Sequence, residues 1–210
     1  MPSILAEKPW SEKTLDEMRP RDWRIFREDY QIQIKGGTDA PPPLRAWRES
    51  PCMPPALLDA IEALGYREPT PIQRQAIPVG LQRRDLIGLA ETGSGKTLSF
   101  VVPMLAHVLR TTRTHGGPYG LILAPTRELA QQIEVEAHNL ARQLGGVRVV
   151  SIVGGRDLGE QAHWLGEGAD MVIATPGRLQ DCLERHMLVL TQCRFLVLDE
   201  ADRMIDMNYE

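Results

Sequence analysis

The residues at 90–100, AETGSGKTLSF, have the types and spacing needed to hold phosphate. Two glycines with a serine between them let the backbone curl so that several N–H groups point inward at phosphate oxygens. The N-terminus of the expected helix carries a partial positive charge that favours phosphate. The lysine supplies a positive charge for the terminal phosphates, and the threonine supplies a hydroxyl ligand for Mg²⁺. The alternative is a glycine turn that merely joins a strand to a helix. The predicted nucleotide-binding residues of this loop are Thr92, Gly93, Ser94, Gly95, Lys96 and Thr97.

An apolar run at 195–198 is followed by two acids, Asp199 and Glu200, within the stretch RFLVLDEAD. A nucleotide site of this kind needs an acid at the end of a neighbouring strand. Asp199 is placed to hold Mg²⁺ through water, together with Thr97, and Glu200 to orient and deprotonate an attacking water. With Lys96, these two acids are the predicted catalytic residues. The alternative is a turn in which the acids stabilise the start of a helix.

Strand-like and helical patterns alternate along the chain, and the elements that they predict must position the phosphate loop and the two acids. This alternation predicts an α/β domain with a mostly parallel sheet and helices on both faces. Ligands of such sheets bind at the carboxyl ends of the strands, where both motifs lie. We expect Pro78 to cut the helix in which it lies. The predicted strands are 85–90, 119–124, 147–153, 170–175 and 194–200, and the predicted helices are 54–65, 71–81, 95–110, 126–144 and 176–186, with a loop at 111–118.

Composition and charge narrow the function classes. Residues 1–50 are charged and rich in tryptophan and proline, which predicts an N-terminal extension and linker, with the main domain at 51–210. The net charge of −4 gives no support to broad electrostatic binding of nucleic acid, so any such partner must be gripped locally. No apolar run is long enough to span a bilayer, and no signal peptide is visible, so we expect no membrane partner. Three widely spaced cysteines indicate reduced thiols in an intracellular protein.

The motifs AETGSGKT and DEAD, in this order, resemble those of the DEAD-box RNA helicases. GYREPTPIQ resembles the glutamine motif of that family, which reads adenine, and the alanine at position 90 is what the family carries. The resemblance implies a RecA-like P-loop NTPase domain that uses ATP and Mg²⁺ and acts on RNA. By this resemblance Gln73 contacts the adenine edge, and Tyr66 and Trp47 pack against or near the ring. The alternatives are that Gln73 caps a helix and that Trp47 is an interface anchor.

Three further segments, PTRELA, a glycine pair and TPGR, resemble the RNA-contacting elements of the family. Helix-start amides, hydroxyls and single arginines can hold a sugar-phosphate backbone without reading bases. Surface salt bridging is the alternative for the two arginines. The predicted RNA-binding residues are Pro125, Thr126, Arg127, Gly154, Gly155, Thr175, Pro176, Gly177 and Arg178.

Segments outside the shared motifs, above all RDWRIFREDY, resemble the spliceosomal subgroup of the family that acts with the tri-snRNP. This resemblance implies pre-mRNA splicing, spliceosomal small nuclear RNP partners and a nuclear location. The family's serine-alanine-threonine linker and second RecA-like domain are not among the 210 residues. We therefore expect these residues to bind nucleotide weakly, to hydrolyse it very slowly, and to present an exposed sheet edge. Another P-loop nucleic-acid translocase and a non-catalytic splicing assembly module are the alternative functions.

Overall fold

The computed structural model describes residues 8–36, 39–112 and 117–207 and contains one parallel sheet. The strands lie in the order β2-β3-β1-β4, and every pair is parallel. The predicted α/β class and the parallel sheet are therefore confirmed. Part of the predicted loop at 111–118 lies outside the described residues. The strands are β1 (Gly120–Leu123), β2 (Val149–Ile152), β3 (Met171–Ala174) and β4 (Phe195–Leu198).

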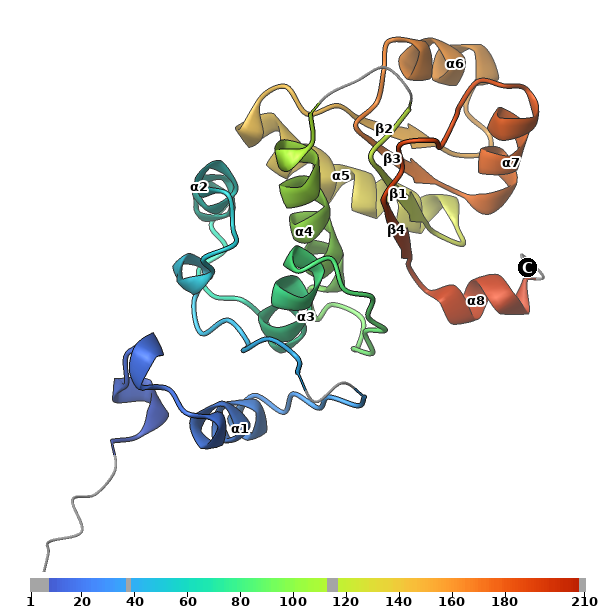
Figure 1. Ribbon diagram of the computed structural model, residues 1–210. Coiled ribbons are helices and arrows are strands. Elements are labelled where there is room, and N and C mark those ends of the chain that lie inside the picture. The colour runs from blue at the N-terminus through green and yellow to red at the C-terminus, as the bar shows by residue number, and fades with distance from the viewer. Residues whose placement is uncertain (1–7, 37–38, 113–116, 208–210) are drawn as a thin grey trace, which may run out of the picture.

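Helices cover both faces of the sheet, as predicted (Figure 1). Side chains alternate along each strand, so that Ile122 and Ile173 face one layer of helices while Leu121 and Val172 face the other. The first layer is formed by α2 (Pro55–Ala63), α3 (Pro71–Leu81), α4 (Lys96–Arg110) and α5 (Arg127–Leu144). The second is formed by α6 (Leu158–Gly166) and α7 (Pro176–Glu184), and a short helix α8 (Ala201–Asp206) follows β4.

The predicted strand at 85–90 is wrong, because this segment is not part of the sheet. Ile87 and Leu89 are 93% and 90% exposed. A strand persists only when a neighbour satisfies its backbone N–H and C=O groups. Among the described residues, no strand pairs with 85–90, and β4 has a partner on one side only.

The unpaired side of β4 is the exposed sheet edge expected from the sequence. On one face of the same strand, the side chains of Leu196 and Leu198 are exposed as well. Because free apolar edges pair with other chains, we expect the protein to self-associate as its concentration rises. Leu196→Lys should restore a monomer, whereas Val135→Lys, at an exposed apolar position of α5, should not. Sedimentation velocity across a concentration series measures this. A wild-type chain that stays monomeric throughout contradicts the prediction.

The prediction that Pro78 cuts its helix is also wrong, since α3 continues to Leu81. Proline has no N–H, so the carbonyl of Arg74, four residues earlier, loses its helical partner. The backbone N–H of Leu44 donates to that carbonyl instead, at 2.8 Å. A segment distant in the chain thus satisfies the group that the proline leaves free.

The N-terminal arm, defined here as residues 8–36 and 39–46, packs beside α3 at the end of the molecule away from α6 and α7 (Figure 1). Three aromatic rings organise it: Phe26 lies 4.8 Å from Trp10 and 4.6 Å from Tyr30, measured between ring centroids. Its helical elements are η1 (Trp10–Glu12), η2 (Leu15–Glu17) and α1 (Pro20–Asp29), and η3 (Trp47–Glu49) follows it. In the described part of the chain, no helix has the length and apolar character needed to cross a membrane.

Candidate nucleotide and RNA site

The predicted phosphate loop lies at the start of α4. Gly93 and Gly95 have φ angles of +80° and +84°, a backbone region that favours glycine. Lys96 folds back over the loop, and its Nζ donates to the carbonyl oxygen of Ala90 at 2.7 Å. Ser94 Oγ donates to the carbonyl of Glu91 at 2.7 Å. The loop therefore curls around its own lysine, with Thr92 exposed and Thr97 half-buried at its two ends.

Gln73 joins the glutamine motif to this loop. Its Oε1 accepts a hydrogen bond from the backbone N–H of Thr70 at 2.9 Å, which caps α3, and its Nε2 donates to the carbonyl of Gly95 at 3.0 Å. The side chain is 2% exposed. One N–H and one lone pair of the amide remain for a further partner. The helix cap is present in the structure, and the contact with adenine stays a prediction.

Tyr66 and Trp47 lie in the layer of helices that also contains α3. Tyr66 is partly buried, and burial, followed by the charge of Glu136, raises the pKa of its hydroxyl. Trp47 is 3% exposed within the core, and its Nε1 has no hydrogen-bond partner among the described residues. Most of the indole surface is therefore packed against protein. A role for either ring beside a nucleotide stays a prediction.

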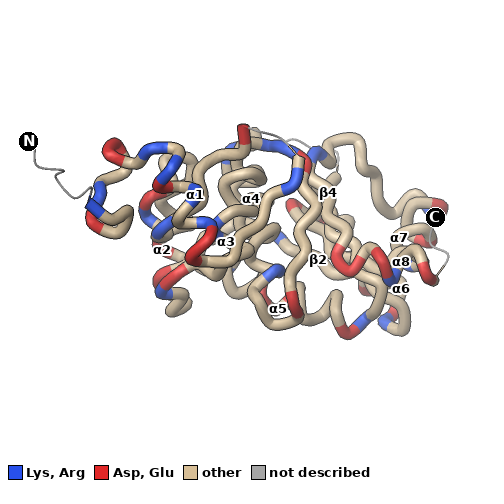
Figure 2. Tube along the Cα trace, turned by 90° about the horizontal axis from the view of Figure 1, so that it is seen from below, with Lys and Arg blue, Asp and Glu red and all other residues tan. Residues whose placement is uncertain are grey.

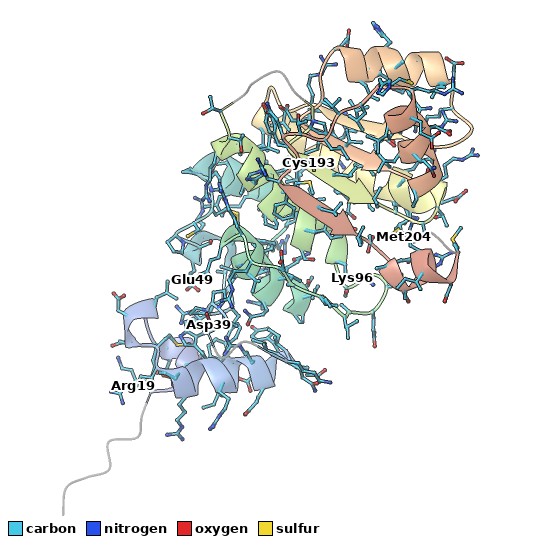
Figure 3. The ribbon with its side chains drawn as sticks, turned by 45° about the vertical axis from the view of Figure 1, so that its right-hand side comes forward. Arg19, Asp39, Glu49, Lys96, Cys193 and Met204 are labelled. Atoms are coloured by element: carbon cyan, nitrogen blue, oxygen red, sulfur yellow. The ribbon has the colours of Figure 1, made fainter. Side chains whose placement is uncertain are left out.

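The two acids follow β4 directly. The backbone N–H of Asp199 donates to Leu123 at 2.9 Å, and Glu200 sits in a left-handed turn with φ +49°. Burial raises the pKa of the Asp199 carboxyl, whereas the backbone N–H of Glu200 and the positive charge of Lys96 act to lower it. Lys96 thus lies within electrostatic reach of Asp199, and Figure 3 shows it near the carboxyl end of β4. Glu200 pairs with Arg203 at 2.6 Å.

This set of groups fits Mg²⁺, which prefers oxygen ligands and keeps several waters. The carboxylate of Asp199 and the hydroxyl of Thr97 are oxygen donors of that kind. Lys96, at the same place, supplies the positive charge that terminal phosphates require. These residues therefore suit a Mg²⁺-bound nucleotide better than a metal held by protein alone.

The predicted RNA-contacting segments follow β1, β2 and β3, which are neighbours in the sheet. Thr126 caps α5, because its side chain accepts from the backbone N–H of Leu129 at 3.3 Å. Pro176 opens α7, preceded by Thr175, whose side chain makes no capping bond. The sheet order thus places the RNA candidates beside one another and puts the acids after the adjacent strand β4. Buried Pro125, exposed Gly177, and the Gly154–Gly155 pair complete this edge.

Arg127 and Arg178 both reach the loop after β2. The guanidinium of Arg127 packs on Gly155, where a Cβ would lie 2.6 Å from Cζ of the arginine. Gly155 has a φ of +79°, so glycine is favoured there for two reasons. Arg178 donates to the carbonyl of Arg156 at 3.3 Å and lies 3.7 Å from Asp181. Arg178 thus has the acidic neighbour that the salt-bridge alternative requires. The roles of Arg127 and Arg178 in RNA binding stay predictions.

Gln161 on α6 was not predicted from the sequence, although it organises the loop of the glycine pair. It is fully buried, and its Oε1 accepts from the backbone N–H of Val153 at 2.9 Å. Its Nε2 lies within hydrogen-bond distance of the carbonyls of Val153, Arg156 and Asp157. A glutamine among the apolar positions of a helix is the only signal that the sequence offers.

We expect Gln161→Leu to loosen this loop and weaken RNA binding, because it leaves buried backbone groups unpaired. The loss should be about fivefold or more, given about 1–3 kcal/mol for such groups. Gln180→Leu, on the exposed surface of α7, is the control. Fluorescence anisotropy with labelled single-stranded RNA measures the affinity. Equal affinities of the two variants contradict the prediction.

Comparisons with known proteins agree with this arrangement. The sequence profile of the family described as DEAD/DEAH box helicase matches residues 70–210. The chain belongs to this family. It is 57% identical over 209 residues to the pre-mRNA-splicing ATP-dependent RNA helicase PRP28 of Cryptococcus neoformans, covering 97% of the chain. It is 57% identical over 208 residues to the PRP28 helicase of Gibberella zeae. The chain spans 28% of the length of these two relatives.

Solved structures show the same fold. The yeast DEAD-box splicing factor Prp28 matches with a TM-score of 0.91 and 49% identity, over 97% of this chain and 48% of that one. The RNA helicase Prp28 from Chaetomium thermophilum, bound to ADP, matches with a TM-score of 0.85 and 57% identity, over 95% and 48%. The expected RecA-like fold and the resemblance to the splicing subgroup of DEAD-box helicases are thus confirmed.

Proposed function

We propose that this chain is the ATP-binding half of an ATP-dependent RNA helicase that remodels RNA duplexes in pre-mRNA splicing. The observation that carries the proposal is the meeting of Lys96, Asp199 and the capping amide of Gln73 around the loop at the start of α4. The relative from Chaetomium thermophilum supports it, because that protein binds ADP. In the proposed division, residues 1–50 form an extension and linker and 51–210 form the first RecA-like domain.

Each residue has a definite task in this mechanism. Lys96 would exchange the carbonyl of Ala90 for a phosphate oxygen. Thr97 and Asp199 would hold Mg²⁺, whose charge would offset that of the phosphates. Glu200 orients a water molecule and accepts its proton. Gln73 favours adenine through its remaining N–H and lone pair. A second RecA-like domain is proposed to complete both the ATP site and the RNA groove.

RNA is the proposed macromolecular partner, held through its backbone by the segments after β1, β2 and β3. In Figure 2 the Lys and Arg positions are interspersed with Asp and Glu positions, which favours a local grip over a broad basic surface. Spliceosomal small nuclear RNP proteins are proposed as partners and the nucleus as the location, because the relatives are named as splicing helicases.

The direct test is the affinity of the 210-residue chain for ADP with Mg²⁺, measured by isothermal titration calorimetry. Lys96→Ala should weaken binding by at least about tenfold, because it removes a charge-assisted contact to phosphate. Lys8→Ala, which removes an exposed lysine from the arm, should have no effect. An unchanged affinity in Lys96→Ala, or no ADP binding by the wild-type chain, would overturn the proposal.

A further inference from the structure

A buried arginine, Arg74, follows Gln73 on α3 and is contacted by the N-terminal arm. Its side chain is 2% exposed, and its guanidinium donates to the carbonyls of Leu44 and Arg45. The Arg74 Cζ atom also lies 4.1 Å from the centroid of the Tyr30 ring and 5.7 Å from that of Phe26. Two parts of the arm, α1 with its following residue and the segment at 44–45, therefore converge on one side chain of α3.

The main chain of Arg74 is held by the arm as well. Its carbonyl is free because Pro78 cannot donate to it, and the N–H of Leu44 fills the vacancy at 2.8 Å. The next residue, Gln75, continues the attachment. Its Oε1 accepts from Arg27 Nε at 3.0 Å, and its Nε2 donates to the carbonyl of Pro41 at 2.9 Å.

Three consecutive residues of α3 thus make polar contacts in two directions. Gln73 contacts the phosphate loop through Gly95, whereas Arg74 and Gln75 contact the arm. The arm therefore contacts the same turn of α3 that carries Gln73. Apolar contacts alone would be enough to attach a segment to a helix. A buried charge such as that of Arg74, in contrast, costs free energy unless well-placed hydrogen bonds compensate its desolvation. Directional contacts of this kind orient a helix as well as attach it.

We propose that the arm is a positioning element of the nucleotide site, which sets the preference for adenine by holding α3, and with it Gln73, through Arg74 and Gln75. This inference rests on the proposed ATP-binding function. Arg74, Tyr30 and Arg27 are positioning residues, because they act on the nucleotide only through Gln73.

The test compares the Kd values of the 210-residue chain for ADP and GDP, measured by calorimetry with Mg²⁺, and uses their ratio as the readout. Arg27→Ala removes the contact to Gln75 and should reduce the preference for ADP by at least about threefold, part of the discrimination of a bidentate amide contact. Arg24→Ala is the matched control, since Arg24 is an exposed arginine of the same helix that pairs with Glu28 at 3.7 Å. The control should keep the wild-type ratio.

A second pair of variants addresses the ring contact. Tyr30→Ala should reduce the ratio in the same way, and Tyr30→Phe should retain it, because phenylalanine keeps the aromatic face over Arg74. Combining Arg27→Ala with Gln73→Ala should change the ratio no further than Gln73→Ala alone, because both act through one amide. Melting temperatures are measured in parallel, since a merely structural arm would lower them and weaken both nucleotides equally.

The outcomes separate the two proposals. A wild-type chain that binds neither nucleotide overturns the nucleotide-binding function and the role of the arm with it. A wild-type chain that prefers ADP, with the same ratio in Arg27→Ala and Tyr30→Ala, overturns the role of the arm alone. Ratios that fall in these two variants and not in their controls support it.

Discussion

Gly95→Ala is expected to weaken ADP binding far more than Gly93→Ala does. Both glycines have positive φ angles, so alanine at either position is strained by about 1–2 kcal/mol. A Cβ at Gly93 meets open space. At Gly95 the same atom would lie 3.2 Å from Thr70 Oγ1 and closer still to the amide nitrogen of Gln73. Only Gly95→Ala therefore displaces Gln73 from the loop.

The separation of the two variants should be about tenfold in Kd, since a displaced buried amide loses about 1–3 kcal/mol. Calorimetric titration with ADP and Mg²⁺ measures both affinities. The preference for adenine gives a second readout. The affinity for ADP relative to GDP should fall in Gly95→Ala and stay at the wild-type value in Gly93→Ala. If the two variants bind ADP equally, the contact between Gln73 and Gly95 does not matter to the site.

The second large effect is expected at Gly155. Alanine there would push the guanidinium of Arg127 away from the loop after β2, and its positive φ adds backbone strain. If Arg127 holds the RNA backbone, the loss of one charge-assisted hydrogen bond, about 1.5–3 kcal/mol, should weaken RNA binding about tenfold or more.

Two other glycines serve as controls for this prediction. Gly166→Ala introduces a methyl group into open space at the last residue of α6. Gly168→Ala adds strain at a φ of +94°, also into open space. Fluorescence anisotropy with labelled single-stranded RNA should show near wild-type affinity for Gly166→Ala and Gly168→Ala. A Gly155→Ala variant that binds RNA as well as these two contradicts a role for the contact.

Local features of the fold were predictable from the sequence alone. The helix predicted at 126–144 is α5, and each of the four strands lies within a predicted apolar run. The glycines at 93 and 95 marked the turn before α4. These features follow from neighbours in the chain, because side-chain alternation, helix starts and positive φ angles are local properties of the backbone.

Tertiary structure decided the features that depend on hydrogen bonds between distant segments. The run at 85–90 has the composition of a strand, yet no described strand lies beside it to pair with. Proline usually breaks a helix, yet α3 continues past Pro78, because the backbone N–H of Leu44 donates to the carbonyl of Arg74 that Pro78 leaves without a helical partner. The packing of Arg127 on Gly155 and the bonds of Gln161 likewise join separate strands and helices. The sequence determined which backbone and side-chain groups need a hydrogen-bond partner. Only the packing of the sheet, the helices and the arm decided which of these groups have one.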